Sequence, residues 1–134
     1  MKILVVEDSA TIRVQYLKML DEMGHKVTTA ADGLAGLHHA VSEEFDLILM
    51  DIKLLCFDGL YITRAIRKHE RQKELTRVPV VAVTATDTTD DECREAGMDG
   101  CVRKPISREG MRRLTEKWDA YNKAYLMQKR RLSS

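Results

Sequence analysis

The chain has 134 residues, a length typical of one compact domain and too short for a two-domain enzyme. Its 22 Lys and Arg residues nearly balance its 21 Asp and Glu residues, and a net charge of +1 argues against a protein that coats a nucleic-acid backbone. With 44% hydrophobic and 32% charged residues, the composition indicates a globular domain and excludes a disordered chain.

Cysteine usage and hydropathy narrow the class further. Cys56, Cys93 and Cys101 form no C-x-x-C pair, so we interpret them as reduced, partly buried thiols and not as a zinc site or a disulfide framework. No apolar run approaches the ~20 residues that a membrane helix needs. Glu7 and Asp8 interrupt the first apolar stretch, which excludes a signal peptide. We therefore expect a cytoplasmic protein.

The first third of the chain predicts a strand, a helix and a second strand. Residues 3–6 are an apolar run that is too short for a helix and typical of a strand buried on both faces. Ser9 can cap a helix in which Ile12, Tyr16 and Leu20 recur at helical spacing and which Gly24 ends. Residues 27–30 give the weakest strand signal.

The middle of the chain repeats this alternation. Asp32 can cap a second helix, which we expect to bury Leu34, Leu37 and Val41. The apolar residues 47–50 then predict a strand, and Asp58 can cap a third helix.

The last third adds two strands and two helices. Residues 78–83 predict a strand, and residues 88–96 predict a helix that Gly97 ends. A fifth short strand, around residues 100–102, is needed to complete the alternation. Only Cys93 and Ala96 form the apolar face of that helix, which suggests a mobile element. The final helix begins near Ser107.

Regular alternation of strands and helices predicts an α/β fold, namely a doubly wound five-stranded parallel sheet with right-handed crossovers. In such a sheet the ligand crevice lies beyond the carboxyl ends of the strands. Glu7 and Asp8 follow the first strand and Asp51 follows the third, so the three carboxylates converge if these strands are neighbours. A cluster of like charges favours a hard cation such as Mg²⁺ between them.

Each of these residues also has an ordinary interpretation. Glu7 and Asp8 could complement the dipole of the first helix, Thr84 could be present for its strand propensity, and Lys104 could be a surface lysine. Asp51 is harder to explain in this way, because an unpaired acid after an apolar strand is costly. The joint occurrence of these residues at matching strand ends favours a functional site.

At these residues the sequence resembles the receiver domain of two-component response regulators, in the single-domain form found in chemotaxis. The resemblance covers about residues 1–120 and rests on six segments in register: ILVVEDS at 3–9, DLILMDI at 46–52, DG at 58–59, VPVVAVTA at 78–85, AGMDG at 96–100 and KPI at 104–106. It implies a flavodoxin-like (β/α)5 fold with strand order 2-1-3-4-5, in a receiver domain of residues 1–120.

The resemblance also implies roles for individual residues. Asp51 would be the phosphoacceptor, and Glu7, Asp8, Asp51 and the backbone carbonyl of Lys53 would be the Mg²⁺ ligands, Glu7 often through water. Thr84 and Lys104 would contact the phosphoryl group. The partner would be a histidine kinase or a histidine phosphotransfer protein, because the chain has no nucleotide-binding loop of its own.

This sequence departs from the family at several positions. Cys101 occupies the switch position, where the family usually has Tyr or Phe, so the usual coupling between the threonine and a ring is in question. Leu55 replaces a common proline in the loop after Asp51, and Cys56 and Phe57 make that loop apolar. Lys53 and Thr86 lie two residues beyond Asp51 and Thr84, at positions that flank the phosphoryl group.

The last helix is predicted to extend over residues 107–131, with a tail at 132–134. Five apolar or aromatic residues of this helix follow the 3-4 spacing of a helical seam: Met111, Leu114, Trp118, Tyr121 and Tyr125. A helix of this length spans about 36 Å, whereas a strand typically spans about 17–20 Å, so the helix must extend beyond the sheet. We expect the first residues of the seam to be core, and Trp118, Tyr121 and Tyr125 to be candidates for docking a second copy or another protein's helix. The alternative is a frayed, solvated tail.

Charge is distributed unevenly along the chain. Residues 107–134 hold 8 basic and 3 acidic residues, which leaves 14 basic and 18 acidic residues in 1–106. We predict a signalling domain with no enzymatic turnover beyond self-catalysed phosphoryl transfer and autodephosphorylation, and no binding to nucleic acid or membrane. The alternatives are a receiver domain of a hybrid histidine kinase, a pseudo-receiver and an aspartyl-nucleophile phosphatase, although Lys53 stands where such a phosphatase needs a second acid.

Overall fold

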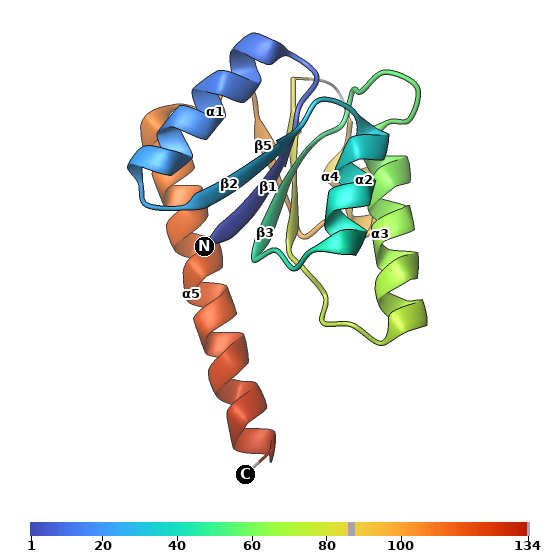
Figure 1. Ribbon diagram of the computed structural model, residues 1–134, viewed down its shortest axis with the longest axis vertical. Helices are drawn as coiled ribbons and strands as arrows, with labels where there is room; N and C mark the ends of the chain where they lie inside the picture. Colours follow the sequence, from blue (N-terminus) through green and yellow to red (C-terminus); the bar gives the residue numbers. More distant parts are fainter. Residues whose placement is uncertain (86–87, 134) are drawn as a thin grey trace.

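Five parallel strands, in the order β2-β1-β3-β4-β5, form the centre of the computed structural model, which describes residues 1–85 and 88–133 (Figure 1). The strands are β1 (Lys2–Val6), β2 (Lys26–Ala30), β3 (Leu47–Asp51), β4 (Val80–Thr84) and β5 (Gly100–Arg103). The helices are α1 (Ala10–Glu22), α2 (Gly33–Ser42), α3 (Gly59–Lys73), α4 (Asp90–Ala96) and α5 (Arg108–Ser133). The predicted fold class and strand order are confirmed.

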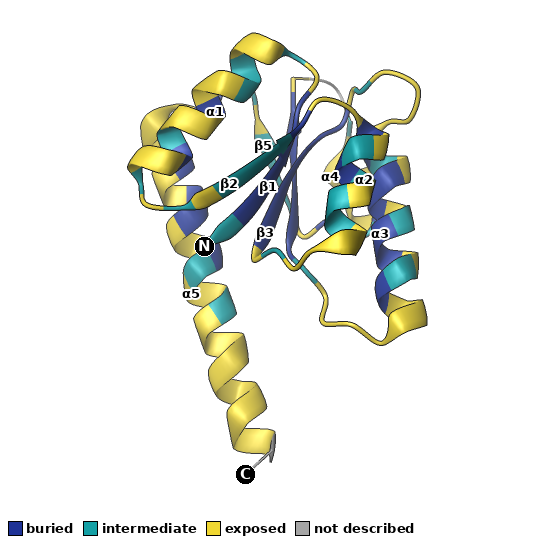
Figure 2. Cartoon of the chain, viewed as in Figure 1, coloured by how far each residue is buried: buried dark blue, intermediate teal, exposed yellow. Residues whose placement is uncertain are grey.

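The sheet is covered on both faces, because alternate residues of each strand point to opposite sides. On one side, Ile3 and Val5 of β1 pack with buried residues of α1 and α5. On the other, Leu4 and Val6 pack with α2, α3 and α4. Figure 2 shows the central strands as the most buried part of the chain. Two apolar cores of this kind explain why the strands read as continuous hydrophobic runs.

The predicted helix starts are confirmed by their caps. Ser9 Oγ accepts a hydrogen bond from the Ile12 N–H, and the carboxylates of Asp32 and Asp58 do the same for the third residue of α2 and α3. Thr89 Oγ1 caps α4, which buries only Cys93 and Ala96 and ends at Gly97 in a left-handed conformation. These side chains satisfy donors that a helix leaves unpaired at its first turn.

The predicted buried face of α2 is wrong in part. Leu34 and Val41 are exposed, and the face that meets the sheet instead contains Gly33, Gly36 and Leu37. A Cβ at Gly36 would lie 2.7 Å from a methyl group of Val6, so the helix backbone approaches β1 more closely than a larger residue allows. A prediction from apolar spacing alone assigns the bulky residues to the buried face of a helix. It misses a face that is buried because its residues are glycines.

β4 begins at Val80, two residues later than predicted, because a buried ion network occupies the preceding segment. The Val78 N–H donates to the carboxylate of Glu70 and the Val78 carbonyl accepts from the Arg67 guanidinium. Arg67 also pairs with Glu70 at 2.8 Å and with Asp99 at 2.7 Å. This network joins α3 to the segments before β4 and β5.

α5 begins at Arg108 and continues through Ser133, so the helix extends further than the expected limit of residue 131. Met111, Leu114 and Trp118 are buried in the core, whereas Tyr121 and Tyr125 are exposed. The second half of the helix lies beyond the sheet, as Figures 1 and 2 show. Among the described residues, we find no helix that is both long and apolar enough to cross a membrane.

Candidate functional site

Three carboxylates meet at the carboxyl end of the sheet, next to the point where the strand order reverses between β1 and β3. Val6 pairs with Met50 in the β1–β3 ladder, so Glu7 and Asp51 follow neighbouring positions. One carboxylate oxygen each from Glu7, Asp8 and Asp51 lies within 4.8 Å of the others. The convergence predicted from the sequence is therefore present in the structure. Glu7 and Asp51 are buried, and Asp8 is exposed.

Lys104 supplies a positive charge to this cluster from the loop after β5. Its Nζ lies 2.7 Å from Oε1 of Glu7 and 3.1 Å from Oδ2 of Asp51. The lysine thus bridges the two buried acids. Its backbone N–H donates to the carbonyl oxygen of Thr84 at 2.9 Å, which ties the lysine to the end of β4.

The electrostatics of the site follow from this crowding. Burial raises the pKa of Glu7, and its hydrogen bond and charge repulsion with Asp51 raise it further, against the opposing effect of Lys104. For Lys104, burial alone lowers the pKa, but the hydrogen bonds to Glu7 and Asp51 outweigh it and the net pKa is raised. Lys104 therefore stays positively charged, and the three acids outnumber this single cation. A second cation would reduce the repulsion between the carboxylates.

The remaining predicted residues lie around this cluster. Thr84 is buried at the end of β4, opposite Arg103 of β5. Lys53 is exposed in the loop that follows Asp51. Thr86, expected to flank the phosphoryl group, lies outside the described residues.

Two residues that the sequence analysis did not single out position the site. Arg13 of α1 donates to the carbonyl oxygen of Glu7 at 2.9 Å, which holds the loop between β1 and α1. Gly59 donates its N–H to the carbonyl of Ile52 at 2.8 Å, and a Cβ at this position would overlap the carbonyl of Asp51. The DG pair at the start of α3 was the only signal for Gly59, whereas no sequence signal indicated Arg13.

Cys101, which the sequence analysis expects at the switch position, is partly buried on β5 and packs against the core beneath α4. The loop residues Leu55, Cys56 and Phe57 are all exposed, and Phe57 stacks on Tyr61. This loop therefore presents apolar side chains beside the acidic cluster.

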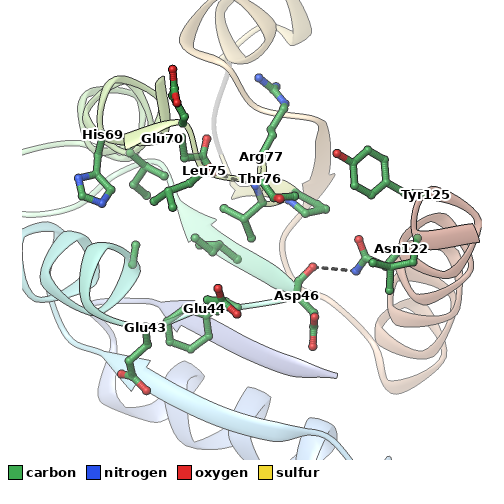
Figure 3. A pocket seen from close by; sticks show the side chains of 18 of the residues that line it. Glu43, Glu44, Asp46, His69, Glu70, Leu75, Thr76, Arg77, Asn122 and Tyr125 are labelled. Atoms are coloured by element: carbon green, nitrogen blue, oxygen red, sulfur yellow. Dashed lines mark hydrogen bonds between the residues drawn. The ribbon is translucent and has the colours of Figure 1, made fainter. Parts of the chain in front are cut away.

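The three candidate docking residues of α5 lie in two environments. Trp118 is buried in the core, with an edge contact to Tyr121. Tyr121 and Tyr125 are exposed on the overhanging half of the helix. Tyr125 lines a groove of about 410 Å³ at the amino ends of the strands, which Figure 3 shows from close by.

Comparisons with known proteins agree with the geometry of the site. Residues 3–116 match the family model described as response regulator receiver domain. The chain is 36% identical over 123 residues to hybrid signal transduction histidine kinase L of Dictyostelium discoideum, covering 87% of this chain and 7% of that protein. It is 33% identical over 119 residues to sensor histidine kinase GacS of Pseudomonas protegens, covering 87% and 13%. The chain thus spans a small fraction of the length of these curated relatives.

Solved structures show the same similarity. The receiver domain of a sensor histidine kinase from Pseudomonas aeruginosa, with a magnesium ion coordinated in its active-site cleft, is 36% identical with a TM-score of 0.77, covering 87% of this chain and 95% of that one. A CheY-like receiver domain protein from Methanospirillum hungatei is 26% identical with a TM-score of 0.80, covering 92% and 97%.

Proposed function

The chain belongs to the response regulator receiver domain family, and on this basis we propose that Asp51 accepts a phosphoryl group from a histidine kinase or a histidine phosphotransfer protein. The observation that carries the proposal is the position of Asp51, buried at the end of β3 with Lys104 at 3.1 Å and two further carboxylates within 4.8 Å. The relatives named above are histidine kinases, which supports phosphohistidine as the donor.

The acidic cluster has the donor chemistry that Mg²⁺ requires. Carboxylate oxygens are hard ligands, and Mg²⁺ typically takes one or two of them while keeping several waters. Asp8 and Asp51 would hold the ion together with the backbone carbonyl of Lys53, with Glu7 in contact directly or through water. The bound ion would neutralise charge on the transferred group.

The chain's own residues would then act on the phosphoryl group. A carboxylate oxygen of Asp51 attacks the phosphorus, a P–O bond forms, and the P–N bond to the donor imidazole breaks. Lys104 exchanges its contact with Asp51 for one with a phosphoryl oxygen, and the Thr84 hydroxyl donates to another. Lys104 already contacts Asp51 and Thr84 is buried at the end of the neighbouring strand, so the reaction needs only a local exchange of contacts.

Incubation with acetyl phosphate and Mg²⁺, followed by intact mass measurement, tests this function. We expect one phosphoryl adduct on the full chain, none with Asp51→Asn, and none when EDTA replaces Mg²⁺. Asp58→Asn is a matched control, since asparagine also caps a helix and Asp58 lies outside the cluster. Absence of an adduct from small donors and from kinases alike would indicate a pseudo-receiver, and steady hydrolysis of unrelated phosphate esters would indicate a phosphatase.

For the overhanging half of α5 we propose a second copy of the chain as the partner. Four large apolar or aromatic side chains are exposed there: Tyr121, Tyr125, Leu126 and Met127. The groove beside them has an acidic rim that includes Glu43, Glu44, Asp46 and Glu74. The end of the same helix carries Lys129, Arg130 and Arg131. Two antiparallel copies of α5 would pair these apolar residues and place each basic end against the partner's acidic rim.

Light scattering at several protein concentrations tests this proposal. We expect a dimer that Tyr121→Ser with Tyr125→Ser disrupts and that high salt weakens. Lys123→Ala is a control, because this substitution removes a charge from the exposed face of the helix and leaves both aromatic rings in place. A monomer at all concentrations would exclude self-association. The exposed aromatic residues of α5 would then bind another protein's helix or have no partner.

A further inference from the structure

Two of the three cysteines lie on different elements and line one cavity in the fold. Cys93 lies on α4 and is 3% exposed, and Cys101 lies on β5 and is partly buried. Both line one cavity of about 190 Å³ between these elements, together with Asp90, Arg94 and Met98. Cys101 lies close enough to Cys93 to contribute to the raised pKa of the Cys93 thiol. The third cysteine, Cys56, is exposed in the loop after β3 and does not line this cavity.

We propose that Cys93 and Cys101 form an oxidative modification site, at which a hydroperoxide converts the two thiols into a disulfide between α4 and β5. The pair has what such a site needs: two thiols on two different elements that line the same cavity, whose rim includes the exposed residues Asp90 and Arg94. Cys101 is the more accessible of the two thiols.

The reaction balances with one equivalent of hydroperoxide. With hydrogen peroxide as the hydroperoxide, the Cys101 sulfur attacks one oxygen, an S–O bond forms as the O–O bond breaks, and the departing hydroxide takes up the thiol proton as water. The Cys93 sulfur then attacks the Cys101 sulfur, an S–S bond forms, the S–O bond breaks, and a second water carries away the Cys93 proton. Two thiols lose two electrons in total and the peroxide gains them.

The order of these steps follows from the environment of each thiol. Burial raises the pKa of Cys93 to about 11, with a further contribution from Cys101, so the Cys93 thiol is protonated near neutral pH. A buried, protonated thiol is a poor first nucleophile toward a solvent-borne oxidant. Cys93 therefore acts second, against a sulfenic acid that is already beside it.

The disulfide would restrain an element that is otherwise weakly attached. α4 is seven residues long, and Cys93 and Ala96 are its buried residues. A bond from its centre to β5 would hold α4 against the sheet, a few residues before Lys104. Because Cys101 occupies the switch position, oxidation would modify the same face that the family resemblance links to signalling.

Treatment of the full chain with hydrogen peroxide, alkylation of the remaining thiols and non-reducing intact mass measurement tests the site. In Cys56→Ser we expect the mass to fall by two hydrogen atoms, both thiols to resist alkylation, and peptide mapping to join residues 93 and 101. Dithiothreitol should reverse all three changes. Amide hydrogen exchange in α4 should slow in the oxidised protein.

Matched variants separate this site from other outcomes. Cys101→Ala and Cys93→Ala should each lose the intramolecular bond, and Cys101→Ala should retain the fold because the position is only partly buried. Two freely alkylated thiols in Cys56→Ser after peroxide treatment would overturn the proposal, and so would oxidation of Cys101 to sulfinic acid without a crosslink. Neither readout depends on phosphorylation of Asp51, so failure here leaves the proposed function intact.

Discussion

Replacing Asp51 with asparagine should stabilise the protein when no divalent cation is present. The side chain is buried at the end of β3, beside Glu7 and Asp8, and it has one cationic neighbour, Lys104, among the ion pairs of the described residues. Asparagine keeps the shape of the side chain and removes its charge. The sign of the effect therefore reports whether repulsion or attraction dominates at this position.

The magnitude follows from the distances. At an effective dielectric constant of about 20, the 3.1 Å contact with Lys104 is worth ~5 kcal/mol of attraction. Glu7 has a carboxylate oxygen within 4.8 Å of Asp51 and, when both acids are ionised, contributes at least ~3.5 kcal/mol of repulsion, which offsets most of that attraction. Asp8, within 4.8 Å but exposed, adds ~1 kcal/mol of repulsion if fully screened by water and ~3.5 kcal/mol if it is not. We expect Asp51→Asn to be more stable by about 1–3 kcal/mol.

Urea denaturation in EDTA and in excess Mg²⁺ measures this difference. A cation at a hundred times its Kd stabilises the native state by about 2.7 kcal/mol, and the wild type should gain more of this than Asp51→Asn, which lacks one carboxylate ligand. The difference in the free energy of unfolding between Asp51→Asn and the wild type should therefore become smaller, or change sign, in Mg²⁺. Glu116→Gln, an exposed acid on α5, controls for the change in net charge. A variant less stable than the wild type in EDTA would refute the reasoning.

Three further predictions concern the support of the site, the buried ion network of Arg67 and the division of α5 into a buried and an exposed part. Gly59→Ala should cost about 1–3 kcal/mol, and should slow phosphorylation of Asp51 by acetyl phosphate, because the added methyl group displaces the end of β3. Arg67→Ala leaves two carboxylates without their buried partner and should cost about 3–5 kcal/mol in thermal or urea denaturation; a cost below 1 kcal/mol would show that water replaces the guanidinium. Trp118→Ala should cost about 3–5 kcal/mol. Tyr121→Ala should leave the stability of the isolated monomer nearly unchanged, and equal losses for the two would contradict their different burial.

Much of the architecture could be predicted from local patterns. Ser9, Asp32 and Asp58 start their helices as expected, because a capping side chain and the backbone donors that it satisfies lie within one turn. Apolar runs located four strands, and the regular alternation of elements required the fifth, with errors of one or two residues at the strand ends. The acids at the carboxyl ends of β1 and β3 were identified because parallel strands bring these ends to one edge of the sheet.

Contacts between distant segments could not be predicted in this way. The Gly36 contact with Val6 reverses the expected face of α2, and Arg67 links α3 to segments about thirty residues later in the chain. The meeting of Cys93 with Cys101 depends on how α4 packs over β5, which spacing alone does not specify.

The sequence by itself determined the order of elements, the two-sided burial of the sheet and the residues that converge at its edge, because these follow from periodicity, capping and a family resemblance. Only the tertiary structure decided that Lys104 bridges Glu7 and Asp51, that Trp118 belongs to the core while Tyr121 does not, and that two thiols share a cavity. Each of these depends on distances between side chains on different elements, which are set by the close packing of the whole domain.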